Sequence, residues 1–520
     1  MGNSDGGQLR TSSSMSSSVE YQHVDAGYFE RRKLKRHAGV WSLWALGVGA
    51  VISGDFFGWN FGLSVGGFGG LLVATGIVAL MYLGICYSIA EMSPAMPHSG
   101  GAYSFARTAM GPWGGYVTGL AESIEYILTP AVIVVGIGSY VGIAVDDIFG
   151  WDVPAPIWWL IFYGIFVGIN IAGVVATFRF TVFITFLALG ILLVFWIGAI
   201  PNFSWSWATN IAPEGGNSRF LPFGWVGVAE AMPFAIWFYL AIEQIPLAAE
   251  ESRNLSRDVP KALRWGIVTL ILASVLTLFL NAGIEPGASE VGESDEPLFL
   301  AFRTIFGSGV GTSVLALVAV AGLVASFHTI IYAYGRKIYS LSRASYFPRC
   351  LSVTHRKTQT PHWALIAGAV IGFLVALLIE FSDDWFGDDV RVGAVLLNMA
   401  VFGAVISYAM QMISFVILRL RFQKIERPYS SPLGTTGAVV AGIIALATLV
   451  FLFLNSDYRL GVYGCAIWFA VGLAVFAAVG RKRLVRSPEE EFALSQSAPP
   501  QSALSQPAPS QSAPSQSQPD

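Results

Sequence analysis

Several acidic side chains of this chain stand inside long apolar stretches, where an ionised group is costly. Asp55 lies halfway along a glycine-rich apolar run, and Glu243 lies in another run that contains a proline. Glu122 and Glu125, three residues apart, lie in a third. A carboxylate at the centre of a bilayer costs about 2.5–3.5 kcal/mol on insertion scales, so it normally faces a cavity or a partner. The positions of these residues predict a site that binds a cation or carries a proton.

The composition indicates what kind of protein holds these residues. Of the 520 residues, 54% are hydrophobic and only 12% are charged, about half the charged fraction that is usual in soluble domains. The net charge is −3 and no basic domain stands out, which excludes a nucleic-acid-binding protein. The three cysteines form no metal or disulfide pattern. The chain is therefore predicted to be an all-α, polytopic membrane protein.

Apolar runs of about 20 residues, the length that crosses a bilayer as a helix, recur along the chain. They fall at 40–64, 69–91, 114–145, 155–175, 179–200, 224–248, 262–284, 309–334, 362–380, 392–418, 434–454 and 460–480. If the N-terminus is in the cytoplasm and the sides alternate, all but a few of the 30 Lys and Arg residues lie inside; the exceptions are Arg219, Arg303, Arg391 and Arg459. The positive-inside rule therefore predicts twelve transmembrane helices with both termini in the cytoplasm.

The two ends of the chain differ from this pattern. Residues 1–36 are rich in Ser and Gly and then turn basic, so we expect a mostly disordered cytoplasmic N-terminal segment. Residues 487–520 repeat Ser, Gln, Pro and Ala, and we expect a disordered cytoplasmic tail because this composition buries little apolar surface. A tail that docks a partner is the alternative to a solvated terminus.

Two of the predicted spans are poor continuous helices. The first reads LGVGAVISGDFFGWN over 46–60, and the sixth reads AMPFAIWFYLAIE over 231–243. Proline removes a helix hydrogen bond, and two broken helices in corresponding positions point to an inverted-repeat transporter with its substrate site between the repeats. The alternatives are a flexible first helix whose Asp55 reaches the outer face, and aromatic residues of the sixth span that only pack.

The third and eighth spans carry further candidates. Glu122 and Glu125 share one helical face and are followed by Tyr126. Two carboxylates this close cannot easily both ionise in an apolar setting, which suits proton coupling or cation binding. The alternative is that one of them pairs with a basic or hydroxyl neighbour. His328, beside Phe327, could relay a proton or bind substrate; a packing residue is the alternative.

Longer motifs resemble one group of transporters. After the glycine-rich first span come AEMSPAMPHSGGAY at 90–103, AEESRN at 249–254, DVPKA at 258–262, GRKIYSLSR at 335–343 and RPY at 427–429. Over roughly residues 36–430 the chain resembles the amino acid–polyamine–organocation superfamily. Within it, the first-span motif VISGDFFGWNFGL looks most like that of the ethanolamine permeases.

This resemblance implies a fold of two inverted five-helix repeats plus two peripheral helices. Residues 37–200 would form the first repeat, 201–223 an extracellular loop, 224–420 the second repeat, and 421–486 the last two helices. Substrate would bind between the broken first and sixth spans, and access would alternate by rocking of one bundle.

The resemblance also assigns roles around the two breaks. Ser53 and Gly54 would line the substrate pocket, Trp237 would close over it, and Glu243 would support the sixth-span break or carry charge. Two further residues are candidates for the pocket wall: Phe234 and Phe327.

The first-span motif departs from that of amino-acid-carrying relatives in one informative way. In those relatives, Gly-Ser-Gly and an apolar residue present backbone N–H groups to the substrate carboxylate, whereas this chain has Ile52 and Asp55 at the first and last of these positions. A fixed carboxylate would repel an α-carboxylate and attract an ammonium group. The departure fits ethanolamine, a small cation with one hydroxyl and no carboxylate.

The coupling ion stays open at this point. The fifth span has no lysine of the kind that replaces sodium in some proton-coupled relatives. Ser326 and Thr329 offer oxygens for a sodium ion, and exchange without a coupling ion is equally open. The candidate substrate-binding residues are Ser53, Gly54, Asp55, Glu122, Tyr126, Phe234, Trp237, Glu243 and Phe327. The candidate coupling residues are Glu122, Glu125, Ser326, His328 and Thr329.

The sequence therefore predicts a secondary active transporter that imports ethanolamine across the cytoplasmic membrane. The alternatives are an amino acid or polyamine permease or exchanger of the same fold, and a transport-dead sensor that signals through its tail. The sequence has no nucleophile–base constellation, metal-ligand cluster or phosphate-binding loop, so we expect neither an enzyme nor a cofactor or metal site. The expected partners are a small-molecule substrate, membrane lipid and a proton or sodium ion, and the oligomeric state is open.

Overall fold

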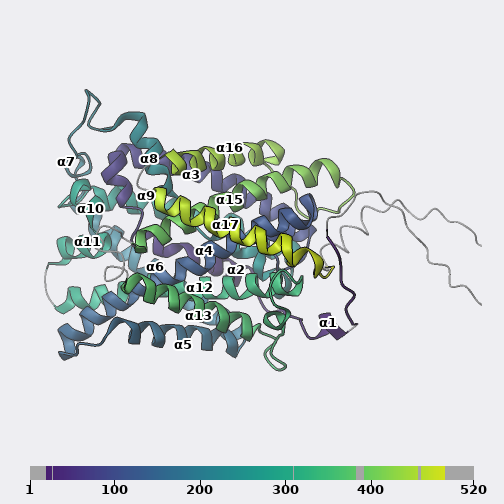
Figure 1. The fold of residues 1–520 in the computed structure, drawn as a ribbon. Helices are drawn as coiled ribbons and strands as arrows, with labels where there is room; N and C mark the ends of the chain where they lie inside the picture. The colour runs from purple at the N-terminus through teal and green to yellow at the C-terminus, as the bar shows by residue number, and fades with distance from the viewer. Residues whose placement is uncertain are drawn as a thin grey trace, which may run out of the picture.

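The computed structural model describes residues 19–25, 27–294, 296–307, 310–381, 392–454 and 458–486. Within these ranges the chain is almost entirely helical, and β structure is limited to two isolated bridges. The helices run side by side in one elongated bundle (Figure 1). The tail expected at 487–520 lies outside the described residues.

Nine helices in the described part of the chain are long and apolar enough to cross a membrane. They are α3 (Phe61–Ala95), α4 (Ala102–Phe149), α5 (Ala155–Ala172), α6 (Val174–Ala199), α9 (Leu255–Ala282), α13 (His362–Glu380), α15 (Val392–Arg421), α16 (Gly434–Leu454) and α17 (Arg459–Ala478). Both α3 and α4 contain one glycine with positive φ, Gly67 and Gly111, just before the apolar run that the sequence predicts as the span.

Three further segments complete the twelve predicted spans. The first is α2 (Val40–Val51), which continues into the 3-10 turn η1 (Ile52–Asp55); the sixth is α8 (Gly224–Ile236), which is separated from η3 (Ile242–Glu251) by residues 237–241. The eighth is α12 (Val310–Arg343). The first and sixth helices are therefore broken, as the sequence predicted.

Short helices connect the spans. They are α1 (Gly27–Glu30), η2 (Ile200–Asn202), α7 (Trp205–Ala208), α10 (Ala288–Glu293), α11 (Pro297–Phe306), η4 (Arg349–Ser352) and η6 (Gly480–Lys482). None of them is long enough to cross a bilayer at 1.5 Å per residue.

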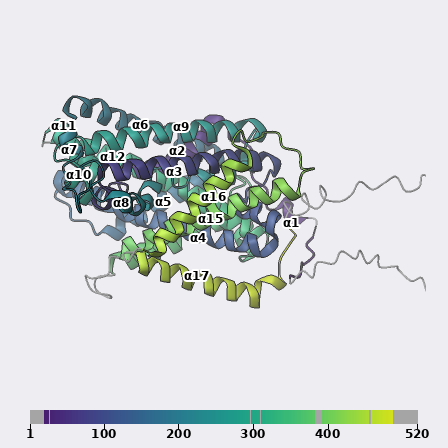
Figure 2. The same cartoon turned by 90° about the horizontal axis from the view of Figure 1, so that it is seen from above.

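The two repeats interlock. The set α2–α6 and the set from α8 to α15 each hold five spans, and the first span of each is broken. Helices of one repeat pack on helices of the other: α3 lies along α8 and α9, and α4 lies along α12 and α15. The last two helices are peripheral (Figure 2). Only 17% of the residues in the most apolar stretch of α17 are buried. The result is the all-α fold of two five-helix repeats plus two helices.

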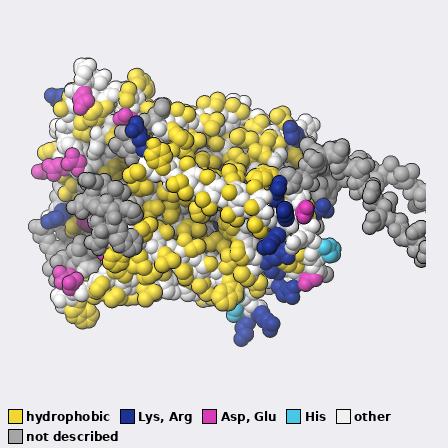
Figure 3. All heavy atoms as spheres, viewed as in Figure 1, with side chains coloured by type: hydrophobic (Ala, Val, Ile, Leu, Met, Phe, Trp, Pro, Cys, Tyr) yellow, Lys and Arg dark blue, Asp and Glu magenta, His cyan; other side chains and the backbone are white. Residues whose placement is uncertain are grey.

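Charge is segregated to the two ends of the bundle. In Figure 3 an apolar belt separates a rim of Lys and Arg side chains from an end where Asp and Glu dominate. We call these the basic end and the acidic end. The basic end includes Arg349, Arg356 and Lys482, and both described ends of the chain lie there.

An ordered pair of terminal segments covers the basic end. The N–H of Glu20 donates to the carbonyl of Arg481 and that of Gln22 to the carbonyl of Leu484, each at 2.8 Å. Tyr21 and Leu484 form a parallel bridge. We call residues 19–25, 27–39 and 480–486 the terminal clasp.

Part of the segment expected to be mostly disordered, residues 27–36, is held by side-chain contacts, whereas residues 1–18 of it lie outside the described residues. The Arg32 side chain is buried, lies 3.7 Å from the centre of the Tyr28 ring and donates to the Ser352 hydroxyl at 2.7 Å. The Tyr28 hydroxyl donates to the carbonyl of Arg343. Two anchored side chains therefore hold a segment whose average composition is polar.

Candidate substrate and coupling site

The two broken helices meet at their breaks. A Cβ atom placed on Gly54 would overlap the backbone carbonyl oxygen of Trp237, so only glycine allows this approach. The Trp237 indole lies over Gly58 and near the Phe57 ring, with centroids 6.5 Å apart. Gly54 thus sets the spacing of the breaks, and Trp237 covers the first one.

Ser53 is tied to the eighth span. Its N–H donates to the Ser326 hydroxyl at 3.0 Å, and that hydroxyl donates to the carbonyl of Gly49 at 3.0 Å. The Thr329 hydroxyl donates to the carbonyl of Ala325 at 2.8 Å. Both hydroxyls proposed for sodium therefore already have protein partners.

Asp55 is fully buried at the first break. Its carboxyl group lies beside Thr277 of α9, which also accepts from the Trp196 indole at 3.2 Å. On the same helix, Ser274 shares a hydrogen bond of 2.8 Å with the Tyr239 hydroxyl. The surroundings of Asp55 are hydroxyl groups, with no basic residue paired to it in the described structure.

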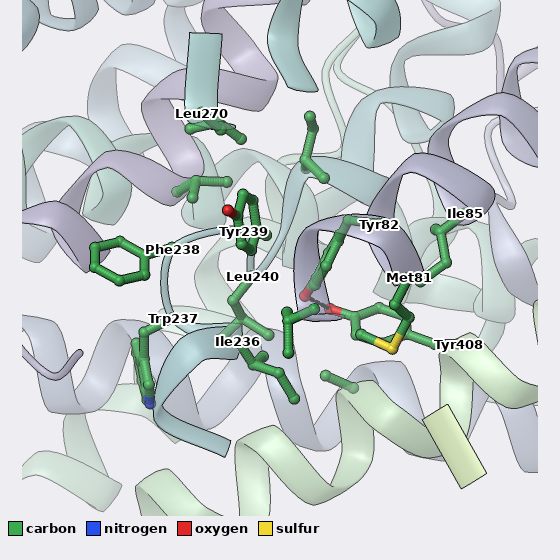
Figure 4. Close-up of a cluster of buried hydrophobic side chains, with 14 of the residues drawn as sticks. Met81, Tyr82, Ile85, Ile236, Trp237, Phe238, Tyr239, Leu240, Leu270 and Tyr408 are labelled. Carbon is green, nitrogen blue, oxygen red and sulfur yellow. Dashed lines mark hydrogen bonds between the residues drawn. The ribbon is translucent and has the colours of Figure 1, made fainter. Parts of the chain in front are cut away.

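A second group of carboxyls lies between α3, α4, η3 and α15. Glu125 and Glu243 are both buried and lie close enough to interact electrostatically. The Tyr408 hydroxyl donates to Glu243 Oε1 at 3.1 Å, and the Tyr82 hydroxyl donates to that of Tyr408 at 2.8 Å. Figure 4 shows these two hydroxyls meeting beside the sixth-span break. Two adjacent carboxylates repel each other, so such a pair suits the binding of a proton or a cation.

Among the described residues, the only lysine near this group is Lys337 of α12. Lys337 forms a buried ion pair with Glu122 and donates to the carbonyl of Gly100 at 2.9 Å. Lys337 thereby neutralises Glu122 and leaves Glu125 and Glu243 without a basic partner. We call Glu122, Glu125, Glu243, Lys337, Tyr82 and Tyr408 the carboxyl cluster.

Other predicted site residues are spread over different surroundings. Tyr126 is buried beside the carboxyl cluster, and its hydroxyl has no hydrogen-bond partner. Phe234 packs against Phe61 and Tyr458, and Phe327 packs against Tyr163 and Phe166 of α5. Phe234 stands in the last turn before the sixth-span break, where its carbonyl accepts from the Trp237 N–H at 3.2 Å.

His328 also faces away from the carboxyl cluster. Its Nδ1 pairs with the Asn170 amide at 3.3 Å and its Nε2 with the carbonyl of Thr177 at 3.4 Å. Phe166 and Phe180 flank the ring. This histidine of α12 packs against α5 and α6, and no contact with Glu125 or Glu243 is found among the described residues.

Sequence reasoning did not select three residues of the cluster. Lys337 stands in the motif at 335–343, just beyond the predicted eighth span, and the structure extends that helix to Arg343. Tyr82 and Tyr408 are buried aromatic residues in apolar spans, and no feature of the sequence distinguishes them from packing residues.

Packed side chains lie on both sides of the breaks. Towards the acidic end, a cavity of about 20 Å³, lined by Phe56, Phe57 and Tyr140 among others, has room for about one water. Towards the basic end, Glu251 of η3 forms a fully buried ion pair with Arg336 of α12 at 2.8 Å and accepts from the Tyr332 hydroxyl.

The terminal clasp adds backbone hydrogen bonds at the basic end. The N–H groups of His37 and Ala38 donate to the carbonyl of Glu251 at 2.7 and 2.8 Å. Arg343 holds Glu250 by two hydrogen bonds of 2.7 and 3.0 Å. Ion pairs and backbone hydrogen bonds therefore lie between the breaks and the basic end.

A family model described as amino acid permease matches residues 39–476, which include both breaks and the carboxyl cluster. The chain belongs to the amino acid permease family. It is thus a transporter of the amino acid–polyamine–organocation superfamily and not an enzyme. This permease is a multi-pass membrane protein that moves a small molecule.

Relatives of this permease cover most of its length. An uncharacterized transporter of Rhizobium meliloti is 29% identical over 464 residues, 85% of this chain and 92% of the relative. The branched-chain amino acid permease BcaP of Bacillus subtilis is 23% identical over 485 residues, 89% of this chain and 96% of the relative. The methylthioribose transporter of Bacillus subtilis is 22% identical over 477 residues, 87% and 95%.

Proposed function

We propose that this permease imports ethanolamine by alternating access between the two broken helices. The observation that carries the proposal is Asp55, a fully buried carboxyl at the first break with no basic partner in the described structure. A small ammonium ion is the ligand that such a group favours.

The charges around the breaks support a cationic substrate. Asp55, Glu125 and Glu243 have no basic partner, and Lys337 offsets only Glu122. A bound cation lowers the cost of keeping such groups buried, whereas a second carboxylate raises it. This argument favours an amino alcohol over a zwitterionic amino acid.

The backbone at the first break also favours a substrate without a carboxylate. The Ser53 N–H already donates to Ser326, so it has no free direction for a substrate carboxylate. In ethanolamine the hydroxyl replaces that carboxylate and needs fewer donors. The unpartnered Tyr126 hydroxyl is a candidate to bind it.

An amino acid or polyamine permease of the same fold is the second candidate. Two relatives that are named as amino acid carriers support it. One is BcaP, and the other is the aromatic amino acid transport protein AroP of Salmonella typhi, which is 22% identical over 439 residues. At these identities a change of substrate within one fold is common, since function resides in the site.

The carboxyl cluster favours a proton as the coupling ion. A proton held by Glu125 and Glu243 would be released when η3 separates from α4. Sodium is the alternative, since the Ser326 and Thr329 hydroxyls donate to backbone carbonyls and still have oxygen lone pairs for a cation.

We place the basic end in the cytoplasm, and the permease in the cytoplasmic membrane, because Lys and Arg gather at that end (Figure 3). Release of substrate inwards would then require breaking of the Glu251–Arg336 pair and the clasp contacts.

The test is uptake of labelled ethanolamine into liposomes that contain the purified protein, with a proton gradient, a sodium gradient or neither. Alanine, lysine, putrescine and choline serve as competitors. We expect saturable, proton-driven uptake that small amino alcohols alone inhibit. Inhibition by alanine, or no ethanolamine uptake, would replace the proposal by the second candidate.

A further inference from the structure

A groove of about 780 Å³ opens at the basic end, beside the peripheral helix α17. One wall is the segment after α12, which includes Tyr346, Phe347 and Arg349. The other wall is the end of α17 with Val475, Val479 and Arg483. Gln22 of the clasp also lines it. We call this the α17 groove.

The inner part of the α17 groove is rigid. The Tyr346 ring stacks on Tyr116 at 5.5 Å between centroids and packs on Phe476 of α17 at 5.5 Å, and its hydroxyl donates to the carbonyl of Pro112 at 2.8 Å. The groove is therefore a built feature of the bundle.

The groove opens where the apolar belt meets the basic rim. Along α17, Ile467, Val471 and Val475 are 64%, 58% and 56% exposed and recur every four residues, so they form one stripe, and Val479, 44% exposed, follows at the helix C-cap. This stripe leads directly into the groove. In a membrane protein such a face contacts acyl chains.

The polar part of the groove is positively charged. Its lining includes Arg349 and Arg483 and no Asp or Glu. Arg349 is held by Gln22, Ser345 and the carbonyl of Arg483. The exposed Arg483 side chain has neither an ion pair nor a hydrogen bond in the described structure. One cation is thus fixed and the other is available.

We propose that the α17 groove binds one anionic phospholipid from the leaflet at the basic end. Its phosphate lies between Arg349 and Arg483, and its acyl chains lie along Val475 and Val479. Basic pockets at this depth suit anionic headgroups. Since Gln22 and Arg483 belong to the clasp, the bound lipid also holds the two terminal segments together.

The experiment uses the full chain in neutral detergent and counts bound lipid by native mass spectrometry. Phosphatidylglycerol and phosphatidylcholine with identical acyl chains are titrated in parallel, together with glycerol phosphate as a soluble anion. The variants are Arg483→Gln and a matched control, Arg356→Gln, an exposed arginine at the same end outside the groove.

We expect one saturable phosphatidylglycerol site, and an affinity about fivefold weaker in Arg483→Gln, since one basic residue near an anionic surface contributes about 1 kcal/mol. Arg356→Gln should bind like the parent. Equal binding of phosphatidylcholine, equal loss in both variants, or competition by glycerol phosphate at the lipid's own concentration would each overturn the proposal. Both altered residues are exposed, and size-exclusion profiles verify that the variants fold.

Discussion

Gly54 and Trp237 touch backbone to backbone, and this contact joins the breaks of the two repeats. We expect Gly54→Ala to abolish uptake, because its methyl group would overlap the Trp237 carbonyl oxygen; overpacking of this kind costs about 1–3 kcal/mol or more. Gly76→Ala is the matched control, since a Cβ there meets nothing within 4 Å. The measurement is ethanolamine uptake per folded protein in liposomes. Equal activity of the two variants would contradict the role of the contact.

The buried Lys337–Glu122 pair makes a prediction about stability. Lys337→Met should lower the free energy of unfolding by about 3–5 kcal/mol, because Glu122 is left as an unpaired buried carboxylate. Adding Glu122→Met should restore most of the loss, since both charges are then absent. Thermal unfolding of the parent, both single variants and the double variant measures the coupling. Additive losses would show that the pair is not coupled.

The Glu125–Glu243 pair predicts the coupling behaviour. Glu125→Gln and Glu243→Gln should each lose proton-driven accumulation of ethanolamine, because a proton held by the pair no longer has two carboxyl groups to move between. Exchange of internal for external substrate should survive. Glu230→Gln, an exposed residue on α8, is the control. If either variant of the pair accumulates substrate as well as this control does, the coupling ion is held elsewhere.

Asp55 predicts substrate selection. Asp55→Ala should weaken ethanolamine binding and make uptake sensitive to alanine, because the repulsion of an α-carboxylate is removed. Asp55→Asn separates charge from size, since it keeps the shape of the side chain. Competition curves with alanine and ethanolamine measure both effects. A variant that binds ethanolamine normally and still excludes alanine would refute the assignment.

The Glu250–Arg343 pair predicts a pH dependence at the basic end. Burial raises the pKa of the Glu250 carboxyl, but the Arg343 guanidinium and the N–H of Ser99 outweigh it and hold this pKa below its usual value of 4.5. The stabilising contribution is therefore complete above about pH 4.5 and is lost as the pH falls through the folded-state pKa. Glu250→Gln should unfold more easily at pH 7, and its difference from the parent should shrink below pH 4.5. A difference that stays constant between pH 7 and pH 3.5 would contradict this account.

The fold could be predicted from the sequence because its determinants are local. Apolar length sets the spans, and the glycines before Asp55 and the proline before Trp237 mark the two breaks that the structure contains. The family was evident from motifs around those breaks. What composition could not reveal was the clasp, because two anchored residues, Tyr28 and Arg32, order a polar segment.

The site could be predicted only in part, because a helix's sequence does not say which side faces which neighbour. Glu125 and Glu243 are 118 positions apart and lie close together through packing alone. His328 and Phe327 lie on α12 as expected but point towards α5. Lys337 joins the cluster because α12 lies along α4. These orientations follow from the tertiary packing of helices.

The bridge between Tyr21 and Leu484 joins a segment that is synthesised early to one that is synthesised late. During biosynthesis, residues 19–25 reach the membrane surface first, and residues 480–486 follow only after every described helix. A chain interrupted before α17 would leave the N-terminal segment without its strand partner and the basic end without its cover. Closure at that end is therefore available only to a chain whose synthesis has passed the last helix.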